Sequence, residues 1–294
     1  MRTLIKLFSL SFLICATLYV FSGITYATDR ENGKSLTFLV VGFDGSPANT
    51  DVLSVISYDS GANTVHALQI PRDTYISYGD KSGKINGYYS YETLVGKTHK
   101  QALSSLSYKI SESLGVSIDG YFALTEEGFC ELVDFVDGVD VAITDVPKEL
   151  TADFKAREDK VHLSGKDAMT FVRYRRDYVR ADLDRLDAQK VFMKALFSKI
   201  CERKELFSLV RFINNSENIY CDINTERSFS FLLGKVFRTE IPDLQIATLP
   251  GVARKIDKSW YYIVKKEEAK ALIKGYFPYE TREFDEKNNF IYKL

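Results

Sequence analysis

The sequence predicts a mixed α/β domain that follows an N-terminal membrane segment. A nearly continuous apolar run at residues 36–43 is typical of a central strand that is buried on both faces. Two further strand-like runs, at residues 52–58 and 64–70, are separated by a tight turn and indicate an antiparallel hairpin. Helical periodicities then alternate with short strand patterns along the rest of the chain. No second linker and no internal repeat is found, so residues 36–294 are expected to form a single domain.

Composition limits the kinds of function that this chain of 294 residues can have. It is 45% hydrophobic and 27% charged, as ordinary globular proteins are. The formal net charge is −1, which argues against a nucleic-acid partner bound over the whole surface. Any site for an anion is therefore expected to be local.

The N-terminus has the pattern of a membrane segment. Residues 7–28 contain no charged residue over 22 positions, and a spanning helix needs roughly 20. Arg2 and Lys6 precede this run, which predicts a cytoplasmic N-terminus and an extracellular body. We favour an uncleaved signal anchor at residues 1–28, followed by a short linker at residues 29–35. A cleaved signal peptide with a small-x-small site at residues 25–27 is the alternative.

The cysteine spacing fits no zinc pattern. Cys130 stands among apolar neighbours and is expected to pack as a small apolar residue. Cys201 and Cys221 could form a disulfide in an exported protein, a point that the sequence leaves open.

Three charged residues flank the first three strands. Asp44 follows the first strand, Asp51 opens the second and Arg72 follows the third. If the first strand lies beside the hairpin and parallel to its third strand, all three residues fall at one edge of the sheet. Two carboxylates there would suit Mg²⁺ that bridges phosphates. The alternative is that the two aspartates form turns and cap strands.

Helix signals recur in the middle of the chain. A polar, tyrosine-rich surface segment is expected from residue 75 to residue 100, and a helix at residues 98–114. Thr125 is a candidate N-cap for a helix that ends at Gly138, and residues 139–143 alternate as a strand does. In the last third, helices are expected at residues 226–237 and 267–276, and strands at 244–249 and 260–264.

A third predicted helix has arginines at its C-terminal end. Ser164 and Asp167 resemble a capping box for a helix at residues 165–172, which would deliver Arg173 and Arg175. An open loop is expected next, with Asp184 capping the following helix. Arg185 would then lie at a helix N-terminus, which favours anions.

An arginine cluster at residues 161–189 is the most informative stretch. Arginine carries a fixed charge and a planar fork of donors that suits phosphate oxygens. With Arg72, the cluster is predicted to bind a pyrophosphate. The alternative is a solvated charged loop whose arginines and aspartates pair with one another. The five arginines are Arg173, Arg175, Arg176, Arg180 and Arg185.

These features, in this order, resemble the LytR–CpsA–Psr family of exported cell-wall phosphotransferases. The resemblance is close from residue 36 to about residue 199 and loose from there on. The motifs are the membrane segment, the apolar strand that ends in Gly-x-Asp, Ile70-Pro71-Arg72-Asp73-Thr74, Lys84-Ile85-Asn86, the phrase from Gly115 to Tyr121, Asp137-Gly138-Val139-Asp140-Val141, Leu163-Ser164-Gly165, Phe171-Val172-Arg173-Tyr174-Arg175, and Asp182-x-x-Arg185 with Gln189.

The resemblance implies an α/β/α sandwich with a central mixed sheet and an apolar pocket for a polyprenyl chain. It implies transfer of a glycopolymer, such as teichoic acid or capsule, from a polyprenyl pyrophosphate carrier to a peptidoglycan hydroxyl. The protein would be anchored in the cell membrane of a Gram-positive-type envelope. Asp44 and Asp51 correspond to Mg²⁺-associated carboxylates. The pyrophosphate-binding and catalytic arginines correspond to Arg72, Arg173, Arg175 and Arg185.

Some positions depart from the family pattern. Arginines usual in the family are absent near Ser46, at Asn49 and at Ala188. Asp73 and Asp182 are predicted to contact the substrate, and both are candidates to accept the hydroxyl proton. A non-catalytic carrier-binding protein for wall assembly, or a polyprenyl pyrophosphate hydrolase, are the alternative functions.

Overall fold

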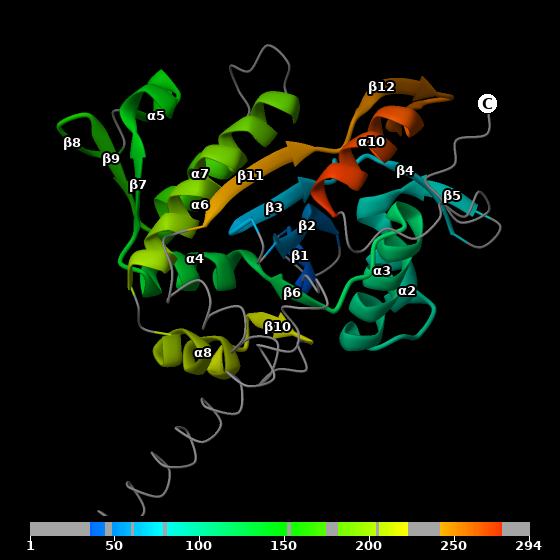
Figure 1. Ribbon diagram of the computed structural model, residues 1–294, viewed down its shortest axis with the longest axis horizontal. Coiled ribbons are helices and arrows are strands. Elements are labelled where there is room, and N and C mark those ends of the chain that lie inside the picture. The colour runs from blue at the N-terminus through cyan, green and yellow to red at the C-terminus, as the bar shows by residue number, and fades with distance from the viewer. Residues whose placement is uncertain are drawn as a thin grey trace, which may run out of the picture.

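A mixed six-stranded sheet forms the centre of the protein (Figure 1). The structure, a computed structural model, describes residues 36–44, 49–59, 62–78, 81–151, 154–174, 182–203, 206–222 and 242–277. The strand order is β10-β6-β1-β2-β3-β11. The strands are β1 (Leu36–Phe43), β2 (Thr50–Asp59), β3 (Thr64–Gln69), β6 (Gly120–Leu124), β10 (Ile219–Cys221) and β11 (Asp243–Thr248).

The pairing directions bring six strand ends to one edge of the sheet. β1 is antiparallel to β2 and parallel to β6, while β3 is antiparallel to β2 and parallel to β11. The C-terminal ends of β1, β3, β6 and β11 therefore lie beside the starts of β2 and β10. We call this the carboxyl edge. Since Asp44, Asp51 and Arg72 follow or open three of these strands, their predicted placement at one edge is confirmed.

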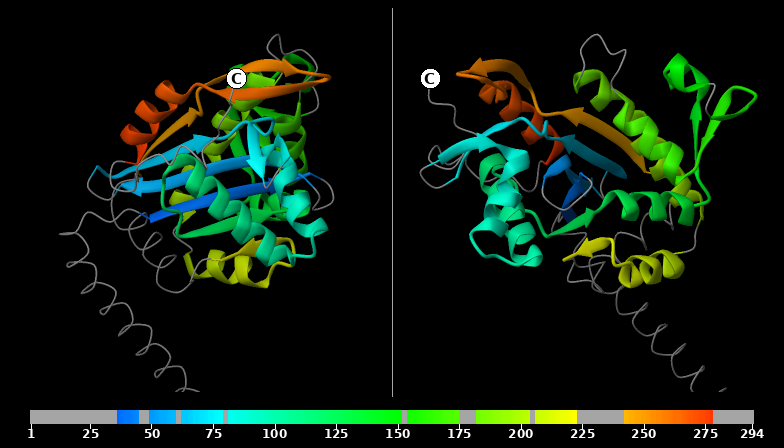
Figure 2. Two further views of the ribbon diagram at one scale, coloured as in Figure 1. Left: turned by 90° about the vertical axis from the view of Figure 1, so that its right-hand side faces the viewer. Right: turned by 180° about the vertical axis from the view of Figure 1, so that it is seen from behind.

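Helices cover both faces of the sheet, which confirms the α/β/α sandwich (Figure 2). On one face, α2 (Tyr88–Leu94) and α3 (His99–Leu114) share an apolar cluster with alternate buried residues of β1 and β2, and α10 (Lys266–Tyr276) joins it over β3. α4 (Glu126–Phe135) and α7 (Asp182–Arg203) pack on the other side. α8 (Leu206–Asn215) joins α4 and β10 in a smaller apolar cluster. β1 is thus buried between two helical layers, as its continuous apolar run predicts.

A second apolar core lies around a three-stranded sheet with the order β7-β9-β8. β7 (Val139–Ala142) confirms the strand predicted there. β8 (Lys155–Arg157) and β9 (Lys160–Leu163) were not predicted, because both are short and lie in a charged segment. His162 lies within β9. The short helices α5 (Lys148–Thr151) and η2 (Ile143–Asp145) complete this region.

Local capping signals place the helix starts where the sequence predicts them. Thr98 and Gln101 form a reciprocal capping box on α3, and this helix ends at Gly115 in the left-handed region with φ 66°. The hydroxyl of Thr125 caps α4 by accepting from the Gly128 amide at 3.1 Å. α7 departs from expectation, since it begins at Asp182 and includes Asp184, which was expected to be its cap.

Two hairpins lie side by side next to the sheet (Figures 1 and 2). They are β4 (Tyr75–Tyr78) with β5 (Lys81–Lys84), and β12 (Gly251–Ile256) with β13 (Ser259–Val264). Thr74 and Tyr262 form an isolated bridge between them, and the rings of Tyr75 and Tyr261 lie 5.4 Å apart. The first hairpin lies where a polar, tyrosine-rich surface segment was expected, and η1 (Ile85–Gly87) and α2 follow it. The sequence of this hairpin shows no clear alternation of apolar and polar residues, so its strands could not be recognised from the pattern.

Several predictions fall outside the described residues. These are the signal anchor, the linker and the helix expected at residues 226–237, so the proposed domain boundaries stay predictions. Within the described part of the chain, no helix has the length and apolar character to cross a membrane. The side chain of Cys201 is also outside, and its pairing with Cys221 stays a prediction. Cys130 is a free, half-buried thiol that donates to the Gly165 carbonyl at 3.3 Å, and burial raises its pKa.

Candidate functional site at the carboxyl edge

A β-bulge positions Asp51. The β1–β2 register pairs Gly42 with Val52 and Phe43 with Thr50, so Asp51 faces no residue of β1. Bulges re-aim side chains and are frequent beside active sites. Gly42 permits this approach, because a Cβ at its position would lie only 3.1 Å from Cβ of Val52. The neighbouring Asp44 amide donates to the Asn49 carbonyl at 3.1 Å, which joins the two ends of the loop between the aspartates.

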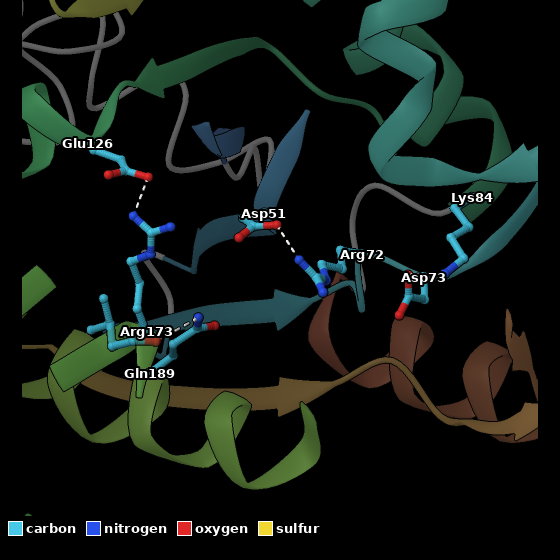
Figure 3. Close-up of polar contacts among 8 residues, drawn as sticks. Asp51, Arg72, Asp73, Lys84, Glu126, Arg173 and Gln189 are labelled. Atoms are coloured by element: carbon cyan, nitrogen blue, oxygen red, sulfur yellow. Dashed lines mark hydrogen bonds and ion pairs between the residues drawn. The ribbon is translucent and has the colours of Figure 1, made fainter. Parts of the chain in front are cut away.

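Arg72 pairs with Asp51 across the edge (Figure 3). Arg72 Nη1 lies 2.6 Å from Asp51 Oδ1, and the two side chains are only 23% and 20% exposed. A partly buried pair loses less of its attraction to solvent than an exposed one. The structure thus brings together one predicted phosphate-binding arginine and one predicted metal carboxylate.

Three backbone hydrogen bonds fix the turn that carries Arg72. The Arg72 carbonyl accepts from the Asn86 amide at 3.1 Å and the Asp73 carbonyl accepts from the Tyr262 amide at 2.9 Å. The third bond runs to the Thr74 carbonyl from the Ile85 amide at 2.8 Å. Two segments distant in sequence therefore hold the turn, which explains the position of the Lys84-Ile85-Asn86 motif.

Asp73 is engaged by Lys84 at 2.8 Å, beside Arg72 (Figure 3). Both side chains are about a third exposed, with 33% for the lysine and 30% for the aspartate. Lys84 thus engages the carboxylate that was a candidate to accept the hydroxyl proton, and that role stays a prediction.

Arg173 reaches the carboxyl edge from the last turn of α6 (Gly165–Arg173). Its guanidinium donates to a carboxylate oxygen of Glu126, the first residue of α4, which directly follows β6. In the view of Figure 3, Asp51 lies between Arg72 and Arg173. Arg173 is 53% exposed and Glu126 is 22% exposed, so the cation remains accessible to a ligand.

The other predicted residues are placed less completely. Arg175 lies outside the described residues, together with Arg176 and Arg180. Asp182 and Arg185 belong to the first turn of α7, but their side chains are not among those that the structure describes. Gln189 on α7 is buried and donates to the Val172 carbonyl at 3.5 Å, which links α7 to the end of α6. Ala188 is buried in the second core, where an arginine would be costly.

The donor set at this edge fits the predicted magnesium ion. Mg²⁺ commonly binds one or two carboxylates together with substrate phosphates and water, and Asp44 and Asp51 offer such oxygen ligands. The hydroxyl of Thr50, buried beside Asp51, has no hydrogen-bond partner among the described residues. Within that part of the chain, no group of three or more acidic, histidine or cysteine residues could hold a metal. A metal here would therefore depend on ligand phosphates.

An open depression of about 640 Å³ lies apart from Arg72, between α4 and α8. Polar residues including Glu131, Asn215 and Asn218 line most of it. Glu131 accepts hydrogen bonds from Ser216 and Asn218 at 2.9 and 2.8 Å, so it orders the loop before β10. Phe212 is the one apolar residue among those that line it, and the apolar pocket expected for a polyprenyl chain stays a prediction.

Glu126 is the residue that sequence reasoning did not assign to the site. Thr125 was identified as a cap, yet the acidic residue after it was given no role. The sequence signal for Glu126 is its position. The residue starts a helix directly after a central strand with a parallel neighbour, and functional side chains in α/β proteins often lie at such strand ends. Acidic residues are also common in first helical turns for reasons of helix stability alone, so the signal is weak.

The match to a family model decides the classification. The LytR_cpsA_psr family model aligns with residues 21–276. The chain belongs to the LytR_cpsA_psr family. This confirms the resemblance that the ordered motifs indicate.

Three bacterial proteins are similar in sequence to this chain. A polyisoprenyl-teichoic acid–peptidoglycan teichoic acid transferase TagU of Oceanobacillus iheyensis is 28% identical over 234 residues, 76% of this chain and 69% of that protein. TagV of Bacillus subtilis, with the same transferase name, is 28% identical over 65% of this chain and 50% of its own length. The cell wall biosynthesis protein LcpA of Corynebacterium glutamicum is 31% identical over 52% of this chain and 33% of its own length.

Solved structures share the fold of this family member. B. subtilis TagV superposes with a TM-score of 0.66 at 21% identity, covering 84% of this chain and 98% of that one. A structure described as TagT bound to LIIa-WTA has a TM-score of 0.65 at 19% identity and covers 83% and 91%. Lin1025 of Listeria innocua has a TM-score of 0.64 at 23% identity and covers 83% and 97%. At these identities the likeness establishes the fold alone.

Proposed function

We propose that this protein moves a glycopolymer from a polyprenyl pyrophosphate carrier to a peptidoglycan hydroxyl on the outer face of the cell membrane. The observation that carries the proposal is that two arginine–carboxylate pairs, Arg72 with Asp51 and Arg173 with Glu126, lie at the carboxyl edge. The names of the relatives, which are transferases of polyisoprenyl-linked teichoic acid to peptidoglycan, support the same substrate class.

The proposed reaction is a phosphoryl transfer. The acceptor hydroxyl oxygen attacks the phosphorus that bears the glycan, and the bond from this phosphorus to the bridging oxygen breaks. The lipid leaves as a monophosphate, the glycan becomes linked through a phosphodiester, and the hydroxyl proton passes to a base or to water. Such a reaction needs alignment and charge neutralisation more than covalent help from the protein.

The arginines supply these two contributions in the proposal. Arg72 is held by its turn and by Asp51, so its guanidinium is oriented before the ligand arrives. Arg173 is more exposed and can exchange Glu126 for a phosphate oxygen. Arg175 and Arg185 are proposed to complete the binding of the pyrophosphate. Magnesium, held by Asp44 and Asp51, would neutralise phosphate charge when it is bound.

The test uses the full chain in detergent with Mg²⁺, a polyprenyl pyrophosphate glycan and peptidoglycan oligomers. Covalent attachment of glycan to peptidoglycan is the expected result. Arg72→Ala should lower attachment and carrier binding by about tenfold or more, because it removes a charge-assisted contact. Arg211→Ala, at an exposed arginine on α8 that is not among the proposed site residues, is the matched control and should leave both unchanged.

The outcomes separate the alternatives. Tight carrier binding with no turnover would favour a non-catalytic wall-assembly factor. Release of lipid monophosphate without attachment would favour a hydrolase that uses water as the acceptor. Equal activity of Arg72→Ala and wild type would overturn the assignment of this edge as the phosphate site.

A further inference from the structure

The β12–β13 hairpin presents a basic and aromatic surface to solvent. Its exposed residues include Val252, Arg254, Lys255, Lys258 and Trp260, and Trp260 is 58% exposed. The hairpin has three basic residues and one acidic residue, Asp257, in a chain whose overall formal charge is −1. Exposed apolar surface that is rimmed by polar residues marks interaction sites, and an indole offers both an apolar face and an N–H donor.

The register places a lysine directly opposite the tryptophan. Lys255 pairs with Trp260, so their side chains leave the hairpin on the same face, with Cβ atoms about 5 Å apart. Lys258 lies in the turn next to them. Among the described residues, no carboxylate forms an ion pair with Lys255 or Lys258. An indole face and two available ammonium groups are thereby gathered at one end of the hairpin.

This surface is continuous with the phosphate site. The Tyr262 amide donates to the Asp73 carbonyl, next to Arg72, and the Tyr262 hydroxyl donates to the Leu249 carbonyl at 2.8 Å. Burial, helped by Glu268, raises the pKa of Tyr262 to about 12, so this donor stays protonated. Lys84, the partner of Asp73, lies 5.9 Å from the ring centre of Tyr261. Strand geometry puts Trp260 about 7 Å and Lys258 about 13 Å along the chain from Tyr262.

We propose that the β12–β13 hairpin binds the phosphate-bearing chain of an anionic glycopolymer as it leaves the pyrophosphate site. Lys255 and Lys258 contact phosphodiester oxygens, and the indole of Trp260 packs against a sugar or polyol face. This inference rests on the proposed function for the position of the pyrophosphate. It narrows the substrate to polyanionic polymers, because only a polymer with negative charges gains attraction from the two exposed ammonium groups. In Figure 1, β12 follows β11 and extends away from the central sheet beside β4, so the hairpin could guide a polymer away from the pyrophosphate site.

The test measures binding of the full chain in detergent to two probes, poly(glycerol phosphate) and inorganic pyrophosphate with Mg²⁺. The double variant Lys255→Gln with Lys258→Gln should weaken poly(glycerol phosphate) binding about fivefold and leave pyrophosphate binding unchanged. Trp260→Ala should weaken polymer binding as well, without the change in salt dependence that the lysine variant shows. A neutral dextran of matched length should bind weakly to all forms.

The matched control is Lys160→Gln with Lys166→Gln, two exposed lysines on β9 and α6, away from the hairpin. The inference would be overturned if polymer affinity fell equally in the control and in the hairpin variant, because binding would then depend only on the net charge of the protein. Unchanged affinity in both the Lys255/Lys258 and the Trp260 variants would overturn it too. Binding to phosphatidylglycerol vesicles, and not to the polymer, would assign the hairpin to the membrane surface and also overturn it.

The two proposals can fail separately. Arg72→Ala should weaken pyrophosphate binding by about tenfold or more and spare most of the polymer binding. If Arg72→Ala leaves pyrophosphate binding intact while the hairpin variants lose the polymer, the proposed function fails and the hairpin surface stands. If Arg72 behaves as expected and the hairpin variants bind the polymer normally, only the hairpin inference is lost.

Discussion

Glu126 keeps Arg173 at the carboxyl edge and, by the same contact, competes with any phosphate for it. The pair joins the first residue of α4 to the last residue of α6, 47 positions apart. Because Arg173 is 53% exposed, this ion pair is screened by water and its attraction is small. A phosphate group, with more charge than a carboxylate, can displace Glu126 at little cost.

Glu126→Gln should therefore strengthen the binding of inorganic pyrophosphate, by about two- to fivefold. The substitution keeps the shape of the side chain and removes the competing charge. Calorimetric titration of the full chain in detergent with Mg²⁺ pyrophosphate measures the effect. Glu127→Gln is the control, since this exposed neighbour has the same charge on the same helical turn. An equal increase in pyrophosphate affinity in both variants would mean that Glu126 acts only through its negative charge and not through its contact with Arg173.

Helix α6 determines where Arg173 lies, and its start is set by a capping box. The Ser164 hydroxyl donates to an Asp167 carboxylate oxygen at 2.7 Å, and the Asp167 amide donates back to the Ser164 hydroxyl at 3.4 Å. Asp134 of α4 also accepts from the Gly165 amide at 2.7 Å. The N-terminal end of α6 is thus attached to the same helix whose first residue pairs with Arg173.

Ser164→Ala should lower the free energy of unfolding by about 1 kcal/mol, because it removes the cap of one helix. Urea unfolding followed by circular dichroism is the measurement. Thr170→Ala on the exposed side of α6 is the control, and is expected to change stability by no more than about 0.5 kcal/mol. Equal stability of Ser164→Ala and wild type would show that the contact with Asp134 alone secures the helix start.

At the scale of the whole molecule, the central sheet is buried between two helical layers, and this burial affects a histidine. His66 on β3 lies between Ser57 of β2 and Gln245 of β11, with its ring 4.8 Å from that of Tyr276 on α10. Burial lowers the pKa of His66, and this outweighs the opposing effect of Asp59 and Asp243. Its Nδ1 is buried without a hydrogen-bond partner among the described residues.

The folded protein should therefore lose stability in mild acid. A histidine whose pKa is lowered by folding contributes stability above its unfolded pKa of about 6.5, and this contribution is lost as the pH falls. The melting temperature should drop between pH 7.5 and pH 5, and His66→Gln should make the drop smaller. An identical drop in His66→Gln would assign the pH dependence to other groups.

Features that depend on neighbours in sequence were predictable. The apolar run of β1, the caps of α3, α4 and α6, and the last helix all arise within a few residues of the side chains that signal them. The alignment of Asp44, Asp51 and Arg72 at one edge was also predictable, because a first strand that lies beside the hairpin and runs in the direction of the third strand ends at the same edge. The charged strands β8 and β9 were not predicted. Their sequences show no strand pattern, and they are strands because β9 pairs with β7 and β8 beside the second core.

By itself, the amino-acid sequence determined the class of the fold, the family and the residue types available for a phosphate site. Only the tertiary structure decided which of those charges meet. The bulge that turns Asp51 toward Arg72, the pairing of Arg173 with Glu126 and the attachment of the β12–β13 hairpin to the Arg72 turn all join segments distant in the chain. The physical reason is that such contacts depend on register and packing between elements, whereas local sequence encodes only periodicity and caps.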